Sequence, residues 1–374
     1  MNAKPQHANG DPVPSRPAKR EAKPLTPPAE ANTLRPDPGA LYQNHPINLK
    51  ILKGLTNQTI HSAKDFDRQT VVELCRLAAV LESLEIAASH PLDGKLVITA
   101  FFEASTRTRI SFESAVLRLD GKIISIPTGD VTGVKKGESL ADIGEMFNAY
   151  GDLVIMRHTE TDSVTEIGRN LRIPLINAGN GSGEHPTQAL ADWYALLKWR
   201  PALAGIGDAP EKNLHLGILG TPGSMRAVKS FLLMALLFQD HIAKVTVISE
   251  MADPFGADLI DDLGDAGIDY AVTNDIQNVI TELDVIYMNS IAFLGDSYKA
   301  LDSRYKLTSK SSLKENAVIL HPLARLDELD TSLDDTPHNL YFSQAHGAIF
   351  VRQALLMSIL RRLDRLPDGV PTKE

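Results

Sequence analysis

One polar stretch of this sequence combines residue types that bind phosphate. Ser105, Thr106 and Thr108 carry hydroxyls, and Arg107 and Arg109 carry guanidinium groups. A hydroxyl donates one hydrogen bond to an anion, and an arginine can hold two phosphate oxygens at once. Because the stretch lacks the glycines of a P-loop, it predicts a phosphate site of another kind.

The flanking residues place this stretch where a strand gives way to a helix. Residues 95–102 form a short apolar, β-rich run, which predicts a buried strand. Apolar residues then recur at helical spacing from Phe112 to Leu119 and stop before Gly121. Free backbone N–H groups and the dipole at the start of a helix favour a bound anion. The alternative for an isolated stretch of this kind is a capped helix start with two solvated arginines.

The composition is that of a globular protein with room for two domains. The chain has 374 residues, 43% of them hydrophobic and 23% charged. Its net charge of −9 argues against a nucleic-acid binder that relies on basicity. No window approaches the length of an uncharged apolar segment that would predict a membrane span. Cys75 is the only cysteine, which excludes an intrachain disulfide, and its apolar helical neighbours predict a core position.

The first 46 residues differ from the rest in composition. They are rich in proline, alanine and charge, which predicts a disordered arm over residues 1–46 with a possible role in docking a partner protein. The arm has no apolar segment of the secretory type. Its four acidic residues argue against a transit peptide, so we expect a cytoplasmic protein.

From residue 47 onward, strand and helix patterns alternate, which predicts an α/β fold with two parallel-sheet domains. In the first half we expect helices over 71–85 and 139–150 and strands over 122–126, 153–156 and 173–177. In the second half we expect strands over 214–219, 244–249, 284–288 and 317–320 and helices over 226–237, 255–266 and 276–283. Residues 193–199 fall on a helix that joins the halves. An amphipathic run over 347–363 predicts a C-terminal helix that returns to the first domain.

Four further motifs follow the phosphate-binding stretch. They cover residues 135–142 (KKGESLAD), 156–158 (MRH), 185–192 (HPTQALAD) and 321–325 (HPLAR). Together with the first stretch they resemble the aspartate/ornithine carbamoyltransferase family. Its patterns read F-x-x-x-S-T-R-T-R-x-S-F-E, K-K-G-E-x-x-x-D, a strand-end arginine, H-P-T-Q-x-x-x-D and H-P-L-P-R. Only Ala324, in place of the second proline, departs from the last of them. Five matches in the family's order over about 250 residues are not a chance coincidence.

The resemblance is closest to the aspartate-type catalytic chain and implies an activity. A carbamoyl group passes from carbamoyl phosphate to the amino group of an acceptor, with L-aspartate first, giving N-carbamoyl-L-aspartate and phosphate for pyrimidine biosynthesis. It implies a carbamoyl-phosphate-binding domain over residues 47–187 plus 343–368 and an acceptor-binding domain over 188–342. It also implies a homotrimer, or a multiple of trimers, with shared active sites, and neither metal nor organic cofactor.

The resemblance assigns roles to individual residues. Those implied to bind carbamoyl phosphate are Ser105, Thr106, Arg107, Thr108, Thr132, Lys136, Arg157, His185 and Gln188. Those implied to be catalytic are Arg107, Thr108, Arg157, His185, Gln188 and Lys136. Those implied to bind the acceptor are Lys136, Arg226, Pro322 and Leu323, the last two through backbone carbonyls. In the family the lysine at Lys136 reaches the substrate of a neighbouring subunit.

These residue types also fit the chemistry of the reaction. An amine that attacks a carbamoyl carbon creates a tetrahedral centre with negative charge on oxygen, and phosphate must leave. Catalysis therefore needs fixed donors at that oxygen and cations around the phosphate. Thr108, Arg157 and His185 suit the first task. A neutral histidine can donate from one ring nitrogen, so His185 need not act as a base.

One string departs from the aspartate-type pattern. Where that pattern reads M-T-R-x-Q, residues 288–292 read MNSIA, so Ser290 replaces the arginine and Ala292 the glutamine. Losing a charge-assisted bond to a carboxylate costs on the order of 2–3 kcal/mol. Candidates to replace the missing arginine are Arg325, Lys299 and Arg304.

Two alternatives therefore stand beside aspartate carbamoylation. The first is a carbamoyltransferase with a different acceptor, favoured by the neutral pair Ser290 and Ala292. The second is a non-catalytic homologue that scaffolds a partner through its N-terminal arm. The second fits the sequence less well, because the carbamoyl-phosphate residues are retained apart from Thr132, where the family usually has serine.

Overall fold

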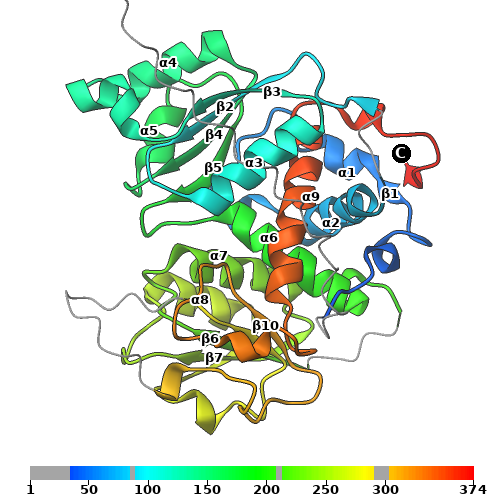
Figure 1. Ribbon diagram of the computed structural model, residues 1–374, viewed down its shortest axis with the longest axis vertical. Coiled ribbons are helices and arrows are strands. Elements are labelled where there is room, and N and C mark those ends of the chain that lie inside the picture. The colour runs from blue at the N-terminus through cyan, green and yellow to red at the C-terminus, as the bar shows by residue number, and fades with distance from the viewer. Residues whose placement is uncertain (1–33, 85–88, 208–212, 290–302) are drawn as a thin grey trace, which may run out of the picture. The chain divides into compact units, whose positions relative to one another are not determined.

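The computed structural model describes residues 34–84, 89–207, 213–289 and 303–374, and the protein has two main parallel sheets. The first sheet has the strand order β3-β2-β4-β5 (Figure 1). Every neighbouring pair in it is parallel, as expected from the alternation of strands and helices. Its strands are β2 (Leu96–Phe101), β3 (Lys122–Ile126), β4 (Leu153–His158) and β5 (Leu175–Asn180).

The second sheet has the order β10-β9-β6-β7-β8 and is also parallel throughout. The predicted α/β class with two parallel sheets is therefore confirmed. The strands of this sheet are β6 (Leu214–Leu219), β7 (Ile242–Ile248), β8 (Asp269–Thr273), β9 (Val285–Tyr287) and β10 (Val318–Leu320). A separate parallel pair joins β1 (Ile47–Asn48) to β11 (Thr372–Lys373).

The strand orders place one switch point in each sheet. In the first sheet β2 pairs with β3 on one side and with β4 on the other. The strand order therefore reverses between β2 and β4, because β3 is added on one side of β2 and the later strands on the other. In the second sheet the same reversal falls between β6 and β9. Parallel α/β sheets bind ligands at the carboxyl ends of the strands at such points. The fold therefore directs attention to the segments after β2, β4, β6 and β9.

The helices start where the sequence supplies capping residues. Asp67 accepts a hydrogen bond from the Thr70 N–H at 2.7 Å and caps the second helix, and Ser139 caps the fourth at 3.1 Å. The helices are α1 (Leu49–Lys53), α2 (Arg68–Ser83), α3 (Thr106–Arg118), α4 (Leu140–Tyr150), α5 (Ser163–Gly168), α6 (Pro186–Trp199), α7 (Arg226–Ala235), α8 (Ala257–Asp265) and α9 (Tyr341–Ile359).

The last helix, α9, returns to the first half of the chain as predicted, and it packs against α2, α3 and α6 (Figure 1). It starts at Tyr341 rather than at residue 347, and it is not amphipathic. Every residue from Val351 to Ile359 is buried, because helices cover it on several sides. A helix that is buried on all sides shows no contrast between an apolar and a polar face, so its burial could not be inferred from periodicity.

Three other predictions were wrong in part. Residues 276–283 form only the short 3-10 turn Ile276–Asn278 instead of a helix. The edge strand β8 was not predicted, since Tyr270 and Val272 are exposed and the strand lacks a buried apolar run. Residues 34–46 were assigned to the disordered arm, but they include the 3-10 turn Pro38–Leu41 and the fully buried Leu41. Residues 1–33 lie outside the described residues.

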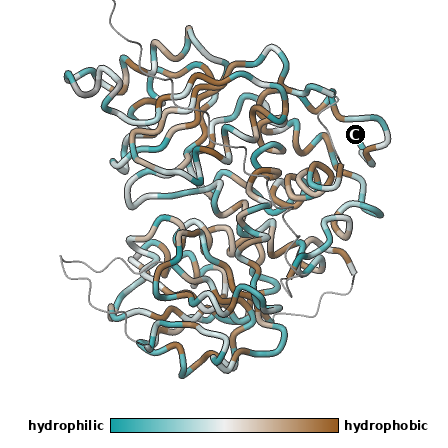
Figure 2. Tube along the Cα trace, viewed as in Figure 1, coloured by the Kyte–Doolittle hydropathy of each residue, from teal (hydrophilic) through white to brown (hydrophobic). Residues whose placement is uncertain are grey.

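The hydrophobic segments gather in the strands and along the buried helices (Figure 2). The largest cluster includes residues from α2, α6, α7 and α9, so it continues from one sheet's helices to the other's. Cys75 is fully buried in this cluster, as predicted, and burial raises the pKa of its thiol. Within the described part of the chain, no helix combines the length and the apolar character that a membrane span requires.

A buried ion pair joins three of these central helices. Lys198 of α6 donates to both carboxylate oxygens of Glu82, in the last turn of α2, at 2.8 and 3.0 Å. The Tyr194 hydroxyl donates to the same carboxylate, and His346 of α9 lies 3.6 Å from it. Only 1% of the Lys198 side chain and 12% of the Glu82 side chain are exposed. Burial alone would raise the pKa of Glu82, but these partners lower it to about 2.

Removing one member of this pair should destabilise the protein strongly. Glu82→Met leaves the Lys198 ammonium buried without an anion, so we expect a loss of about 3–5 kcal/mol in the free energy of unfolding in guanidinium. Because the pKa of Glu82 is lowered on folding, its stabilisation is present above pH 4.5 and disappears as the pH falls toward 2. The difference between wild type and variant should shrink over the same range.

The exposed pair of Glu145 and Arg172 provides the matched control. As in the buried pair, both carboxylate oxygens of the glutamate accept hydrogen bonds from the cation, here from Arg172 at 2.7 and 2.8 Å. Glu145→Met should have a much smaller effect, since water screens an exposed pair. The double variant Glu82→Met/Lys198→Met should recover much of the loss. Equal losses in the two single glutamate variants would contradict the structural role of the buried pair.

Candidate active site

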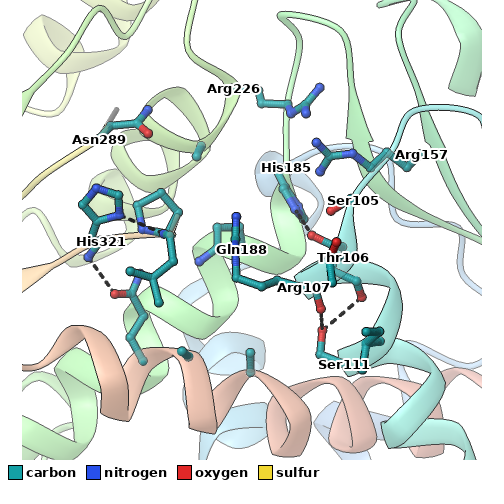
Figure 3. A pocket seen from close by; sticks show the side chains of 18 of the residues that line it. Ser105, Thr106, Arg107, Ser111, Arg157, His185, Gln188, Arg226, Asn289 and His321 are labelled. Atoms are coloured by element: carbon teal, nitrogen blue, oxygen red, sulfur yellow. Dashed lines mark hydrogen bonds between the residues drawn. The ribbon is translucent and has the colours of Figure 1, made fainter. Parts of the chain in front are cut away.

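One cavity of about 700 Å³ collects the segments that follow the switch points of both sheets. The segment after β2 with the start of α3, the end of β4, the start of α6, the start of α7 and the segments after β9 and β10 all contribute to its lining (Figure 3). The residues predicted from sequence that line it are Ser105, Thr106, Arg107, Thr108, Arg157, His185, Gln188, Arg226, Pro322 and Leu323.

Two predicted residues do not line this cavity. Lys136 lies exposed in the 3-10 turn Gly133–Lys136, and the Thr132 hydroxyl donates to the Gly129 carbonyl at 2.7 Å. Arg109, an alternative phosphate ligand, pairs with Glu113 at 3.3 Å. The single chain therefore brings together every residue that the resemblance assigned to the site except Thr132 and Lys136, and the alternative ligand Arg109 also lies outside the cavity.

The phosphate-binding stretch lies at the start of α3, as expected. Ser105 occupies the N-cap position with extended backbone angles, and its side chain makes no capping hydrogen bond. The first-turn N–H groups are thus not satisfied by a capping side chain, which leaves them suited to an anion. Arg107 is exposed to the cavity, and Arg157 lies at the end of β4, paired in register with Phe101 of β2.

Glu103 connects two arginines of the cavity. Its carboxylate accepts from Arg157 Nη2 at 2.6 Å and from Arg226 at 2.5 and 2.8 Å. Burial would raise the pKa of Glu103, but the hydrogen bonds and charges of Arg226 and Arg157 outweigh it and hold the pKa below its usual value. Arg226 also donates to the Gly181 carbonyl at 2.8 Å. Glu103 therefore holds Arg157 of β4 and Arg226 of α7 at one point, and Figure 3 shows the two arginine side chains directed toward one another.

His185 is a neutral ring in this environment. It is almost fully buried, and burial together with the charges of Arg157, Arg352 and Arg226 lowers its pKa well below the usual value. Its backbone N–H donates to the Ser230 hydroxyl at 2.8 Å, and its Nε2 lies 3.4 Å from the Thr108 hydroxyl. A neutral imidazole at the cavity wall can donate to a substrate oxygen but cannot supply a positive charge.

His321 is occupied by protein groups on both sides of its ring. The Leu323 N–H donates to Nδ1 at 2.8 Å, so the ring proton lies on Nε2 and is donated to Glu328 at 2.9 Å. Its backbone N–H donates to Gln344 at 2.8 Å. Neither ring nitrogen is available as a base for a substrate. His321 therefore shapes the turn that brings Pro322 and Leu323 to the cavity.

Two of the cations considered as replacements for the missing arginine are described in the structure, and both are paired elsewhere. Arg325 makes a bidentate pair with Asp334, and Arg304 pairs with Glu250 at 3.0 Å; neither lines the cavity. Asn289 does line it, next to the end of β9. Ser290, Ala292 and Lys299 lie outside the described residues.

Sequence reasoning did not assign roles to several residues of the cavity or its immediate surroundings. Glu103 occupies an unspecified position of the F-x-x-x-S-T-R-T-R pattern, and only the fold shows that two distant arginines reach it. Gln344 and Arg352 come from α9, whose packing was predicted without naming the side chains that it would bring to the cavity. Across the described residues, no three His, Cys, Asp or Glu side chains gather as a metal site would require.

Comparison with known proteins agrees with this geometry. The carbamoyl-phosphate-binding domain model of aspartate/ornithine carbamoyltransferases matches residues 58–198, and the Asp/Orn-binding domain model matches residues 212–359. The chain belongs to the aspartate/ornithine carbamoyltransferase family. Among curated members of this carbamoyltransferase family, the aspartate carbamoyltransferase catalytic subunit of Pyrobaculum islandicum is 37% identical over 306 residues, covering 80% of this chain and 97% of that protein. The chloroplastic aspartate carbamoyltransferase of Arabidopsis thaliana is 33% identical, covering 83% of this chain and 79% of that protein.

Solved structures of carbamoyltransferases share the fold. The aspartate transcarbamoylase of Trypanosoma cruzi in complex with carbamoyl phosphate and aspartate is 28% identical, with a TM-score of 0.72. The match covers 84% of this chain and 99% of that chain. The form with N-(phosphonacetyl)-L-aspartic acid has a TM-score of 0.73 at 27% identity, over 82% of this chain and 97% of that one.

The neutrality of His185 can be tested with inorganic phosphate as a simple oxyanion. His185→Gln keeps a donor but cannot titrate, so the ratio of wild-type to variant phosphate affinity should stay constant between about pH 6 and 8. Calorimetry across this range checks it, and the titration of phosphate itself cancels in the ratio. If instead the ratio increases as the pH falls, with a midpoint at about pH 6.5, the imidazole becomes charged.

Proposed function

We propose that this protein transfers the carbamoyl group of carbamoyl phosphate to the amino group of L-aspartate, giving N-carbamoyl-L-aspartate and phosphate. The carrying observation is that one cavity unites the phosphate-binding stretch before α3 with Arg226 and the Pro322–Leu323 turn. Relatives named aspartate carbamoyltransferase, and a neighbour solved with carbamoyl phosphate and aspartate, support the same substrates. The reaction places the protein in pyrimidine biosynthesis.

The cavity residues divide the work of the reaction. Ser105, Thr106 and Arg107, with the first-turn N–H groups of α3, bind the phosphate and accept its growing charge as it leaves. Thr108 and the neutral His185 donate to the carbamoyl oxygen, and Gln188 holds the carbamoyl group. Arg157 contacts both the carbamoyl oxygen and the phosphate. Fixing both reactants in one cavity supplies much of the remaining acceleration.

The acceptor binds on the other side of the cavity. Arg226 is assigned to a carboxylate of the acceptor, since it is held at the start of α7 by Glu103 and Gly181. The backbone carbonyls of Pro322 and Leu323 receive the attacking amino group. Because aspartate carries two carboxylates, we assign its second one to the region near Asn289, at the switch point of the second sheet.

We further propose that the active form is a trimer or a multiple of trimers, in which Lys136 reaches the cavity of a neighbouring copy. Lys136 is exposed and lies outside the cavity of its own chain. The exposed apolar side chains of Ile110 and Leu117 on α3, with Ile124 on the edge strand β3, provide a surface that a second copy can cover. The same proposal places the domain boundaries near residues 187 and 343. It also expects the protein to be cytoplasmic.

The first test is turnover with the purified protein. With saturating carbamoyl phosphate and L-aspartate, we expect ureido-product formation that exceeds the rate with L-asparagine, L-glutamate or L-ornithine by about a hundredfold or more. Colorimetric detection of the ureido group checks this. Activity only with another amine would identify a different acceptor. Tight carbamoyl phosphate binding with no product from any amine would instead support a non-catalytic scaffold.

The shared site can be tested by mixing two inactive variants. Lys136→Ala and His185→Ala should each lose most activity, because each removes a group from every site. If sites form between copies, dissociation and reassembly of an equal mixture should restore about a quarter of wild-type activity, since each mixed trimer regains one intact site. Mixing two Lys136→Ala preparations is the control. No recovery in hybrids of confirmed mixed composition would place Lys136 in its own chain's site or outside catalysis.

A further inference from the structure

Asp192 is a buried carboxylate for which the steps described so far provide no role. It lies on α6, one turn after Gln188, and is completely buried. It does not line the cavity, although its neighbours do. A fully buried carboxylate is costly to desolvate unless it is well hydrogen-bonded, so its partners indicate why it is there.

The two oxygens of Asp192 have different partners. Oδ1 accepts from the side-chain amide of Gln188 at 2.7 Å and from that of Gln344 at 2.5 Å. Oδ2 accepts from the Tyr287 hydroxyl at 2.9 Å. One oxygen thus fixes two glutamines that line the cavity, one from α6 and one from α9.

Gln344 continues the connection to the acceptor side. With its NH₂ group on Asp192, its Oε1 accepts from the His321 backbone N–H at 2.8 Å. The same histidine holds the Leu323 N–H through Nδ1. The orientation of the Gln344 amide is therefore determined at both ends, and it links Asp192 to the turn of residues 321–323.

We propose that Asp192 is a positioning residue that aligns both halves of the site from one oxygen, holding Gln188 directly and the His321–Leu323 turn through Gln344. This inference rests on the proposed function, in which Gln188 meets the carbamoyl group and the turn meets the attacking amine. A single buried carboxylate then sets the distance and angle between the two reactants. Gln188 lies between the His321 side and the phosphate-binding side of the cavity (Figure 3).

The alignment does not require a permanent charge on Asp192. Burial raises the pKa of Asp192 to about 7, although the hydrogen bonds from Gln188, Gln344 and Tyr287 lower it. Of the charged or titratable groups, Arg352 from α9 and Tyr287 from β9 act on it, whereas both glutamines are neutral. A proton can occupy Oδ2, because the Tyr287 hydroxyl can accept as well as donate. The two glutamine bonds to Oδ1 then persist in either protonation state.

This geometry predicts different results for two substitutions at one position. Asp192→Asn keeps an oxygen for both glutamines and offers its NH₂ group to Tyr287, so kcat and both KM values should stay within about threefold of wild type. Asp192→Leu removes the acceptor at similar volume. It should raise the KM for carbamoyl phosphate and for the amino acid together, each by about tenfold or more, and lower kcat.

Three further variants provide matched controls. Tyr287→Phe removes the bond to Oδ2 alone and should leave both KM values near wild type. Gln188→Leu should raise mainly the KM for carbamoyl phosphate, and Gln344→Leu mainly that for the amino acid. Denaturant unfolding of every variant separates loss of stability from loss of alignment. An Asp192→Leu variant that is less stable but has unchanged KM values would overturn the proposal. The same holds if Asp192→Asn raises both KM values as much as Asp192→Leu does.

A crystal structure of Asp192→Leu tests the alignment without relying on activity. The proposal expects the Gln188 and Gln344 amides to rotate away from their wild-type positions, and unmoved amides would overturn it. If wild type converts no amine, the proposed function fails by that measurement alone. The positions of the two amides still decide whether Asp192 orients them.

Discussion

The carboxylate of Glu103 is the contact on which the arrangement of the cavity depends. Arg157 lies near the end of β4 in the first sheet, and Arg226 begins α7, which follows β6 of the second sheet. The two carry like charges in a partly buried space, where repulsion is weakly screened. Glu103 accepts from both, at 2.5–2.8 Å, and so permits two cations to share one site before any anionic substrate arrives. A site for two anionic reactants needs this density of positive charge, and a single internal carboxylate stabilises it without filling the phosphate-binding end.

The strand order explains why these residues meet at all. Each sheet reverses its order once, between β2 and β4 and between β6 and β9, and the carboxyl ends at both reversals contribute to one cavity. The first reversal supplies the start of α3 and Arg157, and the second supplies Arg226 and Asn289. The helices α6 and α9 then add polar side chains from between the sheets, including Gln188 and Gln344. In the proposed function, the phosphate is therefore bound by segments that follow strands of the first sheet and the acceptor by segments that follow strands of the second, and α6 and α9 connect the two sets.

Much of this could be predicted from the sequence, and the exceptions have physical causes. Buried strands such as Leu214–Leu219 are largely apolar runs, and both this strand and β3 were predicted with their correct bounds. The exposed strand β8 and the second half of α9, where every residue from Val351 to Ile359 is buried, lack the contrast between faces on which periodicity depends. The phosphate-binding stretch was recognisable because its residues are adjacent in sequence. Glu103 reaches its two arginines, and Asp192 reaches Tyr287 and Gln344, only through tertiary packing, over separations that no local pattern records.

The acceptor half is where this chain departs from its family's pattern, and the described residues limit how it can compensate. Arg304 and Arg325 are already paired with Glu250 and Asp334, and moving either would leave a carboxylate without its partner. Asn289 is uncharged, and a neutral donor contributes about 0.5–1.5 kcal/mol where a charged one contributes about 1.5–3. Recognition of a second carboxylate from this side alone would therefore be weaker than in a two-arginine site. Under the proposed function this difference affects the affinity for the acceptor, whereas the chemical step depends on the other end of the cavity, which Arg107 and Arg157 line.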